Sequence, residues 1–285
     1  MTTARISALT AASLTAFAAN SLLTRGALAA GRIDPASFLA IRITAGAMAL
    51  WLLTRRHRAG VSNDDPANHW TATFALIGYA VAFTFAYVRI GAGMGALALF
   101  GAVQTTMIGV GLRAGERPGR AEVAGLLVAL AGLLTLTVPG ATRPPLVGVV
   151  LMVVAGTCWG AYSLQGRRSR DPLIGTAHNF MRAVPVVLAV LVWQRAGVSV
   201  TPMGVTFAAI SGAVTSGVGY AIWYSVLPQL TAWRAALVQL LTPVLTAIAA
   251  VVILGESMSP RLWISGALIV SGVVVSLGAR ARRHA

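Results

Sequence analysis

Ten apolar runs, each of about 17 to 25 residues, dominate this chain. A run of that length can cross the hydrocarbon core of a bilayer as an α-helix, which rises about 1.5 Å per residue. The sequence therefore predicts an all-α integral membrane protein with ten transmembrane helices. The expected spans are 6–24, 36–53, 70–88, 94–112, 121–138, 146–164, 173–193, 204–226, 233–253 and 262–279.

The composition favours a membrane protein over a soluble one. Hydrophobic residues make up 57% of the 285 residues, charged residues only 10%, and the mean hydropathy is +0.78. All 22 basic residues are arginines, against 7 acidic residues, so the net charge is +15. Because the arginines cluster between the apolar runs, we expect them to set membrane topology and not to bind nucleic acid.

The arginines also predict orientation. With a cytoplasmic N-terminus, 14 arginines fall on the cytoplasmic side and 6 outside, with Arg42 and Arg182 inside spans. Cytoplasmic loops carry the excess of basic residues, so we expect both termini in the cytoplasm. Residues 1–24 resemble a secretory signal, with a cleavage-like Ala16-Phe17-Ala18. We expect this segment to stay as the first span, because its removal would leave the first half one helix short.

A short motif occurs twice, and each copy follows one predicted span and precedes another. The pairs that share a 140-residue offset include Gly115-Glu116 with Gly255-Glu256, and Arg42 with Arg182. An odd number of spans separates the copies, so they must face opposite sides of the membrane. We expect two inverted five-helix repeats, an arrangement typical of secondary transporters. The predicted repeats are residues 1–139 and 140–285.

Several motifs resemble a known family. They are Ile33-Asp34-Pro35-Ala36 with Arg42, Gln104 with Gly115-Glu116, and the run Tyr220, Trp223, Pro228, Gln239, Pro243, Gly255-Glu256 and Gly272. These features are similar to two EamA domains of the drug/metabolite transporter (DMT) superfamily. The resemblance covers nearly the whole chain and implies a ten-helix carrier of the bacterial inner membrane, often an exporter of amino acids or other metabolites. It also implies a central cavity built mainly from the third, fourth, eighth and ninth helices.

Arg182 is the first candidate for substrate binding. It lies about ten residues, or roughly 15 Å, into the span 173–193, and therefore near the midplane. A central arginine costs on the order of 2.5–3.5 kcal/mol on insertion scales, so a polar partner, a water-filled cavity or an anionic substrate must offset it. Its repeat mate Arg42 is expected nearer the outer surface, where its side chain can snorkel.

Aromatic and amide side chains supply the other candidates. Tyr220 and Trp223 share one helix face, and Trp159 lies in the span 146–164. An interfacial aromatic belt and a substrate cavity both fit this pattern. The neutral polar candidates are Asn20, Gln104, Asn179 and Gln239, each of which could bind substrate or tie two helices together.

The acidic residues narrow the substrate class. None of the seven is predicted at the midplane, which disfavours proton-coupled export of a cationic drug. The Gly-Glu motifs are expected to fix turns, with each Glu near the N-terminus of the next helix. We therefore expect a secondary transporter whose substrate is a small neutral, zwitterionic or anionic metabolite such as an amino acid.

Two alternatives remain open at this stage, a lipid flippase on the same scaffold and a membrane-embedded enzyme. The sequence shows no paired acids, metal-ligand cluster or activated nucleophile, so we expect no catalysis, metal or cofactor. The expected partners are a small-molecule substrate and membrane lipids. The sequence leaves open the substrate's identity, the coupling ion, the transport direction and the oligomeric state.

Overall fold

The computed structural model describes residues 1–55, 69–90, 92–137, 145–194, 197–254 and 259–281. The second Gly-Glu motif, Gly255-Glu256, and the boundary between residues 139 and 140 lie outside the described residues. The described residues contain ten helical spans that are long and apolar enough to cross a membrane, as predicted. Eight of these spans are single helices. They are α1 (Thr3–Leu28), α2 (Pro35–Thr54), α3 (Trp70–Tyr87), α4 (Ala92–Arg113), α5 (Arg120–Thr137), α6 (Leu146–Arg167), α7 (Pro172–Trp193) and α12 (Pro260–Ala281).

The eighth and ninth spans are composite. The eighth begins as an α-helix, widens into a π-helical segment and returns to α-helix before a short 3₁₀ turn. The ninth breaks at Leu240, between two α-helices. The elements are α8 (Pro202–Ile210), η2 (Ser211–Val218), α9 (Gly219–Val226) and η3 (Leu227–Gln229), then α10 (Ala232–Gln239) and α11 (Leu241–Leu254).

Local sequence explains where several helices start. The Asp34 carboxylate accepts a hydrogen bond from the Ser37 N–H at 2.9 Å, and the Asp171 carboxylate accepts one from the Ile174 N–H at 3.2 Å. Each aspartate is followed by a proline at the first helical position. An N-cap oxygen satisfies a backbone donor that the helix leaves unpaired, and proline suits the first turn because it has no N–H.

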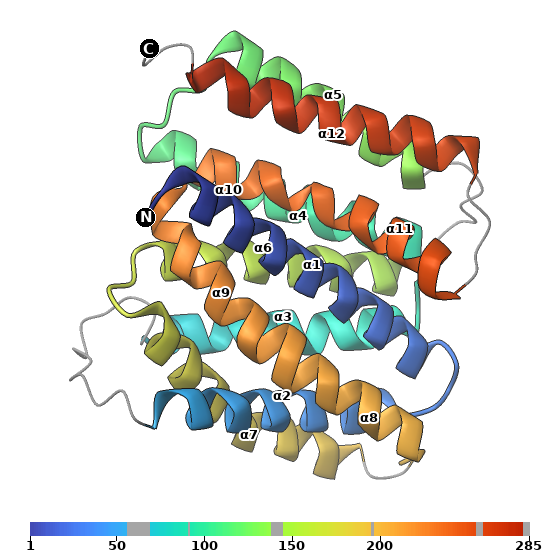
Figure 1. The fold of residues 1–285 in the computed structure, drawn as a ribbon. Coiled ribbons are helices and arrows are strands. Elements are labelled where there is room, and N and C mark those ends of the chain that lie inside the picture. Colours follow the sequence, from blue (N-terminus) through green and yellow to red (C-terminus); the bar gives the residue numbers. More distant parts are fainter. Residues whose placement is uncertain (56–68, 91, 138–144, 195–196, 255–258, 282–285) are drawn as a thin grey trace.

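The helix contacts follow an inverted repeat. Equivalent spans of the two halves pack on each other, as α2 does on α7, α4 on α10 and α5 on α12. The remaining contacts come in matched pairs: α3 packs on α6 as α9 packs on α1, and α4 packs on α6 as α11 packs on α1. The start of α1 and the end of α12 lie at the same end of the bundle (Figure 1), as an even number of spans requires. We call this the terminal end and the opposite one the far end.

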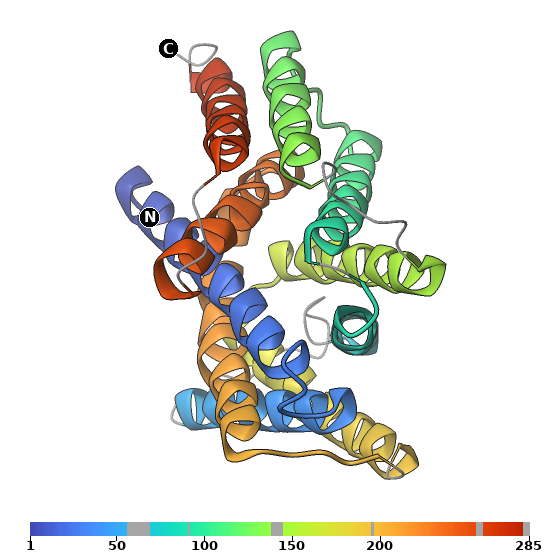
Figure 2. The same ribbon diagram turned by 90° about the vertical axis from the view of Figure 1, so that its right-hand side faces the viewer.

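Glycines allow the α5–α12 pair to pack closely at one edge of the bundle (Figures 1 and 2). A Cβ atom added to Gly125 would lie 2.5 Å from the Gly272 carbonyl oxygen. One added to Gly132 would lie 2.8 Å from the Ile269 side chain. Small residues commonly bring membrane helices into such contact. This pair therefore packs as a unit beside the helices that form the centre of the bundle.

Candidate functional site

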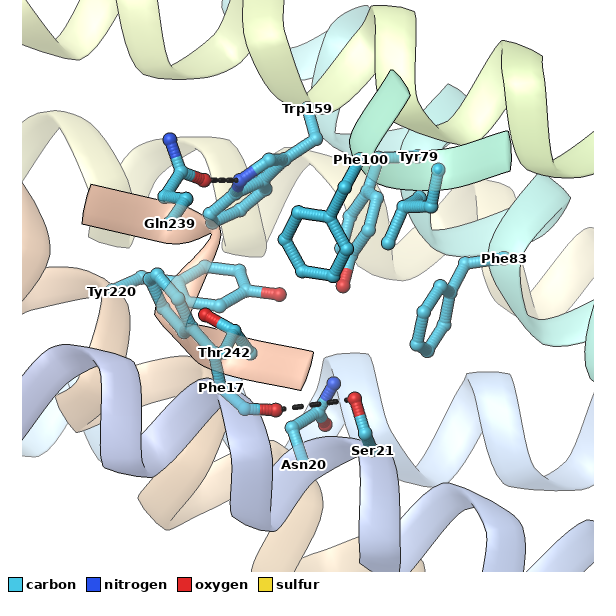
Figure 3. A pocket seen from close by; sticks show the side chains of 11 residues that line it. Phe17, Asn20, Ser21, Tyr79, Phe83, Phe100, Trp159, Tyr220, Gln239 and Thr242 are labelled. Carbon is cyan, nitrogen blue, oxygen red and sulfur yellow. Dashed lines mark hydrogen bonds between the residues drawn. The ribbon is translucent and has the colours of Figure 1, made fainter. Parts of the chain in front are cut away.

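Two neighbouring cavities lie at the seam between the halves. The smaller, which we call the inner cavity, has a volume of about 30 Å³, and its wall is largely aromatic (Figure 3). Its lining residues are Phe17, Asn20, Ser21, Tyr79, Phe83, Leu99, Phe100, Trp159, Tyr220, Gln239 and Thr242. The larger, which we call the vestibule, has a volume of about 720 Å³ and shares Ser21, Phe83, Leu99 and Phe100 with the inner cavity.

Ring contacts build the aromatic wall. The Phe17 ring meets Trp159 and Tyr220 edge-on, with centroids 5.3 and 5.8 Å apart. Trp159 also lies against Tyr79 at 5.0 Å and against Tyr220 at 4.8 Å. Edge-to-face and tilted pairs at these separations are favourable, which gives the aromatic wall a defined shape. The rings come from α1, α3, α6 and α9, so both halves contribute.

A few polar side chains lie between the aromatic residues of this wall. The Trp159 indole N–H donates to the Gln239 side-chain oxygen at 2.6 Å (Figure 3). The Gln239 amide nitrogen donates to the Ala235 carbonyl at 2.9 Å. Asn20 accepts a hydrogen bond from the Ser211 hydroxyl at 2.7 Å. The Thr242 hydroxyl is buried and has no hydrogen-bond partner among the described residues. An apolar wall with a few placed polar groups is typical of a small-molecule site.

The break in the ninth span lies at this site. Pro243 lacks an N–H, so it cannot bond the carbonyl of Gln239 four residues earlier, and the helix is interrupted between the two residues. Gln239 and Thr242 line the inner cavity, and Pro243 lines the vestibule. Interrupted helices next to a central cavity are typical of secondary transporters.

The terminal end of the seam is closed. Tyr162 and Tyr224 pack edge-on with ring centroids 5.0 Å apart, and the Tyr224 hydroxyl donates to the Tyr162 carbonyl at 3.1 Å. The Tyr224 ring packs against Gly166, where any side chain would clash. Beside these rings, the Glu116 carboxylate lies 3.2 Å from the Arg167 guanidinium. Glu116, which follows α4, thereby joins the first half to α6, while the tyrosine pair packs α9 on α6 within the second half.

The vestibule, in contrast, is lined by residues of the far end. Its wall includes Arg25 and Ala29 beyond the middle of the first span, Ile90 after α3, and Arg261 at the start of α12. Among the described residues, its lining contains no carboxylate. The structure is therefore closed at the terminal end and hollow toward the far end.

Four predicted site residues line the inner cavity: Asn20, Trp159, Tyr220 and Gln239. The other four lie outside the lining of both cavities. Gln104 donates to the Ala236 carbonyl at 2.7 Å, Asn179 accepts from Thr73 at 2.8 Å, and Trp223 donates to Ser163 at 3.4 Å. Arg182 is half-buried, with its guanidinium 5.1 Å from the centroid of the Trp70 ring at the start of α3. Their roles in substrate binding stay predictions.

The snorkelling expected of Arg42 is wrong. Its side chain is 1% exposed, and its guanidinium donates to Ser216 at 3.0 Å, to Tyr220 at 3.0 Å and to Tyr79 at 3.5 Å. The π-helical segment brings Ser216 to this position, while Gly212 packs on the Arg42 carbonyl. The rotation of α2 turns Arg42 into the protein and away from lipid, which the position of a residue along its span does not reveal.

The expected role of Glu116 also needs correction. Its carboxylate accepts hydrogen bonds from the N–H groups of Ala232 at 2.8 Å and Trp233 at 3.0 Å, at the start of α10. The carboxylate thus binds a helix N-terminus, as predicted, but the helix belongs to the other half and is not the next one, α5. Glu116 therefore joins the two halves at the terminal end.

The family resemblance implied that the third helix lines the cavity, but the predicted site residues included none from α3. Tyr79 and Phe83 line the inner cavity, and Phe83 and Tyr87 line the vestibule. The three residues occur at i, i+4 and i+8, so they share one helix face. That spacing was a usable signal for an aromatic wall. Phe17 and Phe100, by contrast, have no aromatic residue three or four positions away in the sequence.

A bundle of inverted halves with an aromatic cavity at their seam is the architecture of a membrane transporter. The comparisons with known proteins agree. A family model described as the EamA-like transporter family matches residues 146–278, within the predicted second repeat. A Pseudomonas aeruginosa protein named "Uncharacterized protein PA1977" is 44% identical over 278 residues, covering 97% of this chain and 96% of the relative. This chain belongs to the EamA-like transporter family, within the drug/metabolite transporter superfamily.

More distant relatives share the architecture. A Salmonella typhimurium protein named "Probable amino-acid metabolite efflux pump" is 25% identical over 232 residues, which is 72% of this chain and 74% of the relative. A solved structure described as "Crystal structure of protein" superposes with a TM-score of 0.77 at 22% identity. It covers 94% of this chain and 98% of the other. At that identity the likeness concerns the fold alone.

Proposed function

We propose that this chain is a secondary transporter that exports a small metabolite, an amino acid or a similar neutral, zwitterionic or anionic compound. The single observation that carries the proposal is the cavity at the seam, closed toward the terminal end by Glu116, Arg167 and the Tyr162–Tyr224 pair, and hollow toward the far end. A carrier needs such a site, with access from one side at a time.

The mechanism follows from the helix contacts. The Tyr162–Tyr224 pair lies within the second half, and the contacts that cross the seam are those of Glu116, just after α4, with α6 and α10. If the halves rock about the seam, these contacts separate while the vestibule narrows. The break at Pro243 and the π-helical segment of the eighth span supply places where those spans can bend. The inner cavity, with its aromatic wall, would hold the substrate while the halves change position.

Direction and placement complete the proposal. Both termini lie in the cytoplasm, because arginines are concentrated at the terminal end. The vestibule then opens outward from a bacterial inner membrane, and this state would release substrate outside the cell. The name of the Salmonella relative, an efflux pump for amino-acid metabolites, supports export of the same class. We propose transport without catalysis, with a small molecule and membrane lipids as the partners.

Reconstitution tests this proposal. Purified protein in liposomes should exchange at least one member of a panel of amino acids and organic acids, measured by counterflow of the labelled compound. A Gln239→Ala variant should fold but lose most of that exchange, because Gln239 lines the inner cavity and bonds Trp159. Absence of flux for the whole panel, together with translocation of fluorescent phospholipid, would favour a flippase instead.

A further inference from the structure

We propose that Arg42 selects for substrates that carry a carboxylate, acting through the hydroxyls of Tyr79 and Tyr220 in the wall of the inner cavity. The inference rests on the proposed transport function and concerns the same cavity. It assigns Arg42 as a specificity-determining residue that sits behind the wall, because Arg42 itself does not line the cavity.

Within the described part of the chain, no carboxylate pairs with the charge of Arg42. Its hydrogen-bond partners are three neutral hydroxyls, those of Ser216, Tyr220 and Tyr79. Its guanidinium also lies 5.6 Å from the ring centroids of both Tyr79 and Phe83. One terminal nitrogen, Nη1, is buried and has no hydrogen-bond partner among the described residues. A buried cation with only neutral partners favours the arrival of an anionic group.

Tyr79 and Tyr220 lie between Arg42 and the inner cavity and are polarised by its charge. Arg42 Nη2 donates to both phenol oxygens, so these oxygens act as acceptors toward the arginine. Each phenol keeps its own O–H to donate, either to the neighbouring hydroxyl or into the cavity. Figure 3 shows the Tyr79 and Tyr220 hydroxyls pointing toward the middle of the lining residues. A donor polarised by a neighbouring cation binds a carboxylate more strongly than it binds an amide.

The vestibule, which adjoins the inner cavity, also carries positive charge. Arg25 and Arg261 lie in the vestibule wall, whose described lining contains no Asp or Glu. A concave surface lined by one sign of charge concentrates ligands of the opposite sign. Positive charge thus continues from the far end to the guanidinium behind Tyr79 and Tyr220.

Matched pairs of ligands test the inference. We would titrate purified protein with L-phenylalanine and L-phenylalaninamide, L-leucine and L-leucinamide, and benzoate and benzamide. Binding is followed by intrinsic tryptophan fluorescence, because Trp159 lines the inner cavity. We expect the carboxylate to bind at least about tenfold more tightly than its amide in at least one pair, since a hydrogen bond to a charged group contributes about 1.5–3 kcal/mol.

Variants separate Arg42 from general packing. In Arg42→Gln the ratio of the two dissociation constants should fall to about one, whereas Arg113→Gln, at an exposed position ending α4, should keep it. Arg42→Lys and Tyr220→Phe provide the same contrast if Arg42→Gln does not fold. Arg42→Lys keeps the charge and should keep the preference for the carboxylate. Tyr220→Phe loses the hydroxyl, which should reduce the ratio of the two dissociation constants several-fold.

Equal binding of carboxylates and amides by the wild-type protein would overturn the inference, as would an unchanged ratio in Arg42→Gln or Tyr220→Phe. Failure of every carboxylate to bind would overturn it as well. These outcomes differ from failure of the proposed function. Binding needs no translocation, so a carboxylate that binds selectively but is never transported refutes the carrier and leaves the role of Arg42 intact.

Discussion

The Glu116 carboxylate lies 3.2 Å from the Arg167 guanidinium and also accepts the first backbone N–H groups of α10. One side chain of the first half therefore holds two elements of the second half at the terminal end. Arg167 adds a hydrogen bond to the Leu230 carbonyl at 2.8 Å, just before α10. This cluster ties the two halves together at the terminal end, beside the Tyr162–Tyr224 pair of the second half.

Glu116→Gln should destabilise that closed state. The amide loses the ion pair and the negative charge at a helix N-terminus, a change of about 1 kcal/mol, or roughly fivefold in an equilibrium between conformations. The check is the distance between spin labels at Leu112 and Ser225, which are both exposed near the terminal end, in a Cys158→Ala background. We expect a longer-distance population to grow. Arg113→Gln removes a nearby exposed charge and should leave the distances unchanged.

Trp159→Phe should weaken substrate binding without unfolding the protein. The substitution keeps a ring in the aromatic wall of the inner cavity but removes the N–H that donates to Gln239. We expect the apparent KM for counterflow to rise about fivefold, corresponding to about 1 kcal/mol. Trp193→Phe is the matched control, because Trp193 is 86% exposed and lines neither cavity. An equal effect of both substitutions would argue against a binding role for Trp159.

Pro243→Ala should slow transport while preserving or raising thermal stability. Alanine restores an N–H that can bond the Gln239 carbonyl, which would straighten the ninth span beside the cavity. The measurements are the counterflow rate and the thermal unfolding midpoint. Pro185→Ala makes the same chemical change at an exposed position inside α7 and should leave the rate unchanged. A normal rate in Pro243→Ala would show that the interruption is not needed for the transport cycle.

Gly125→Ala should destabilise the α5–α12 pair. The added methyl meets the Gly272 carbonyl and the Ser276 backbone, with no flexible side-chain end that can simply move aside. Overpacking of this kind costs about 1–3 kcal/mol, which thermal unfolding in detergent would detect as a lower midpoint. Gly101→Ala is the control, because a Cβ there meets nothing within 4 Å. It should leave the midpoint unchanged or raise it, and a midpoint in Gly125→Ala equal to the wild type would contradict the close packing.

The fold was largely predictable because membrane spans depend on local sequence. Length and hydropathy placed all ten spans, and the 140-residue offset indicated the inverted halves. Rotation about each helix axis was harder to predict. Arg42 and Arg182 share residue type and offset, yet Arg42 is buried behind the inner cavity and Arg182 contacts Trp70 at the start of α3. Which face of a span meets lipid depends on its neighbours, and no single span encodes that.

The candidate site was predictable only in part for the same reason. Gln104 and Gln239 are both buried amides near the seam, but only Gln239 lines a cavity, because Gln104 is directed at the α10 backbone. The contact of Glu116 with α10 likewise joins residues more than a hundred positions apart. The aromatic face of α3 is the exception, since the spacing of Tyr79 and Phe83 is visible in the sequence.

In the proposed transport cycle, substrate reaches the same cavity from alternate sides of the membrane. The most direct test is the rate at which a membrane-impermeant thiol reagent modifies Ser21→Cys, in a Cys158→Ala background, from each side of oriented vesicles. Ser21 lines both cavities, and the substitution changes its size little. We predict modification from the far end in the otherwise wild-type protein, and roughly fivefold faster modification from the terminal end when Glu116→Gln is added. Equal modification from both ends without Glu116→Gln, or no change with it, would contradict alternating access.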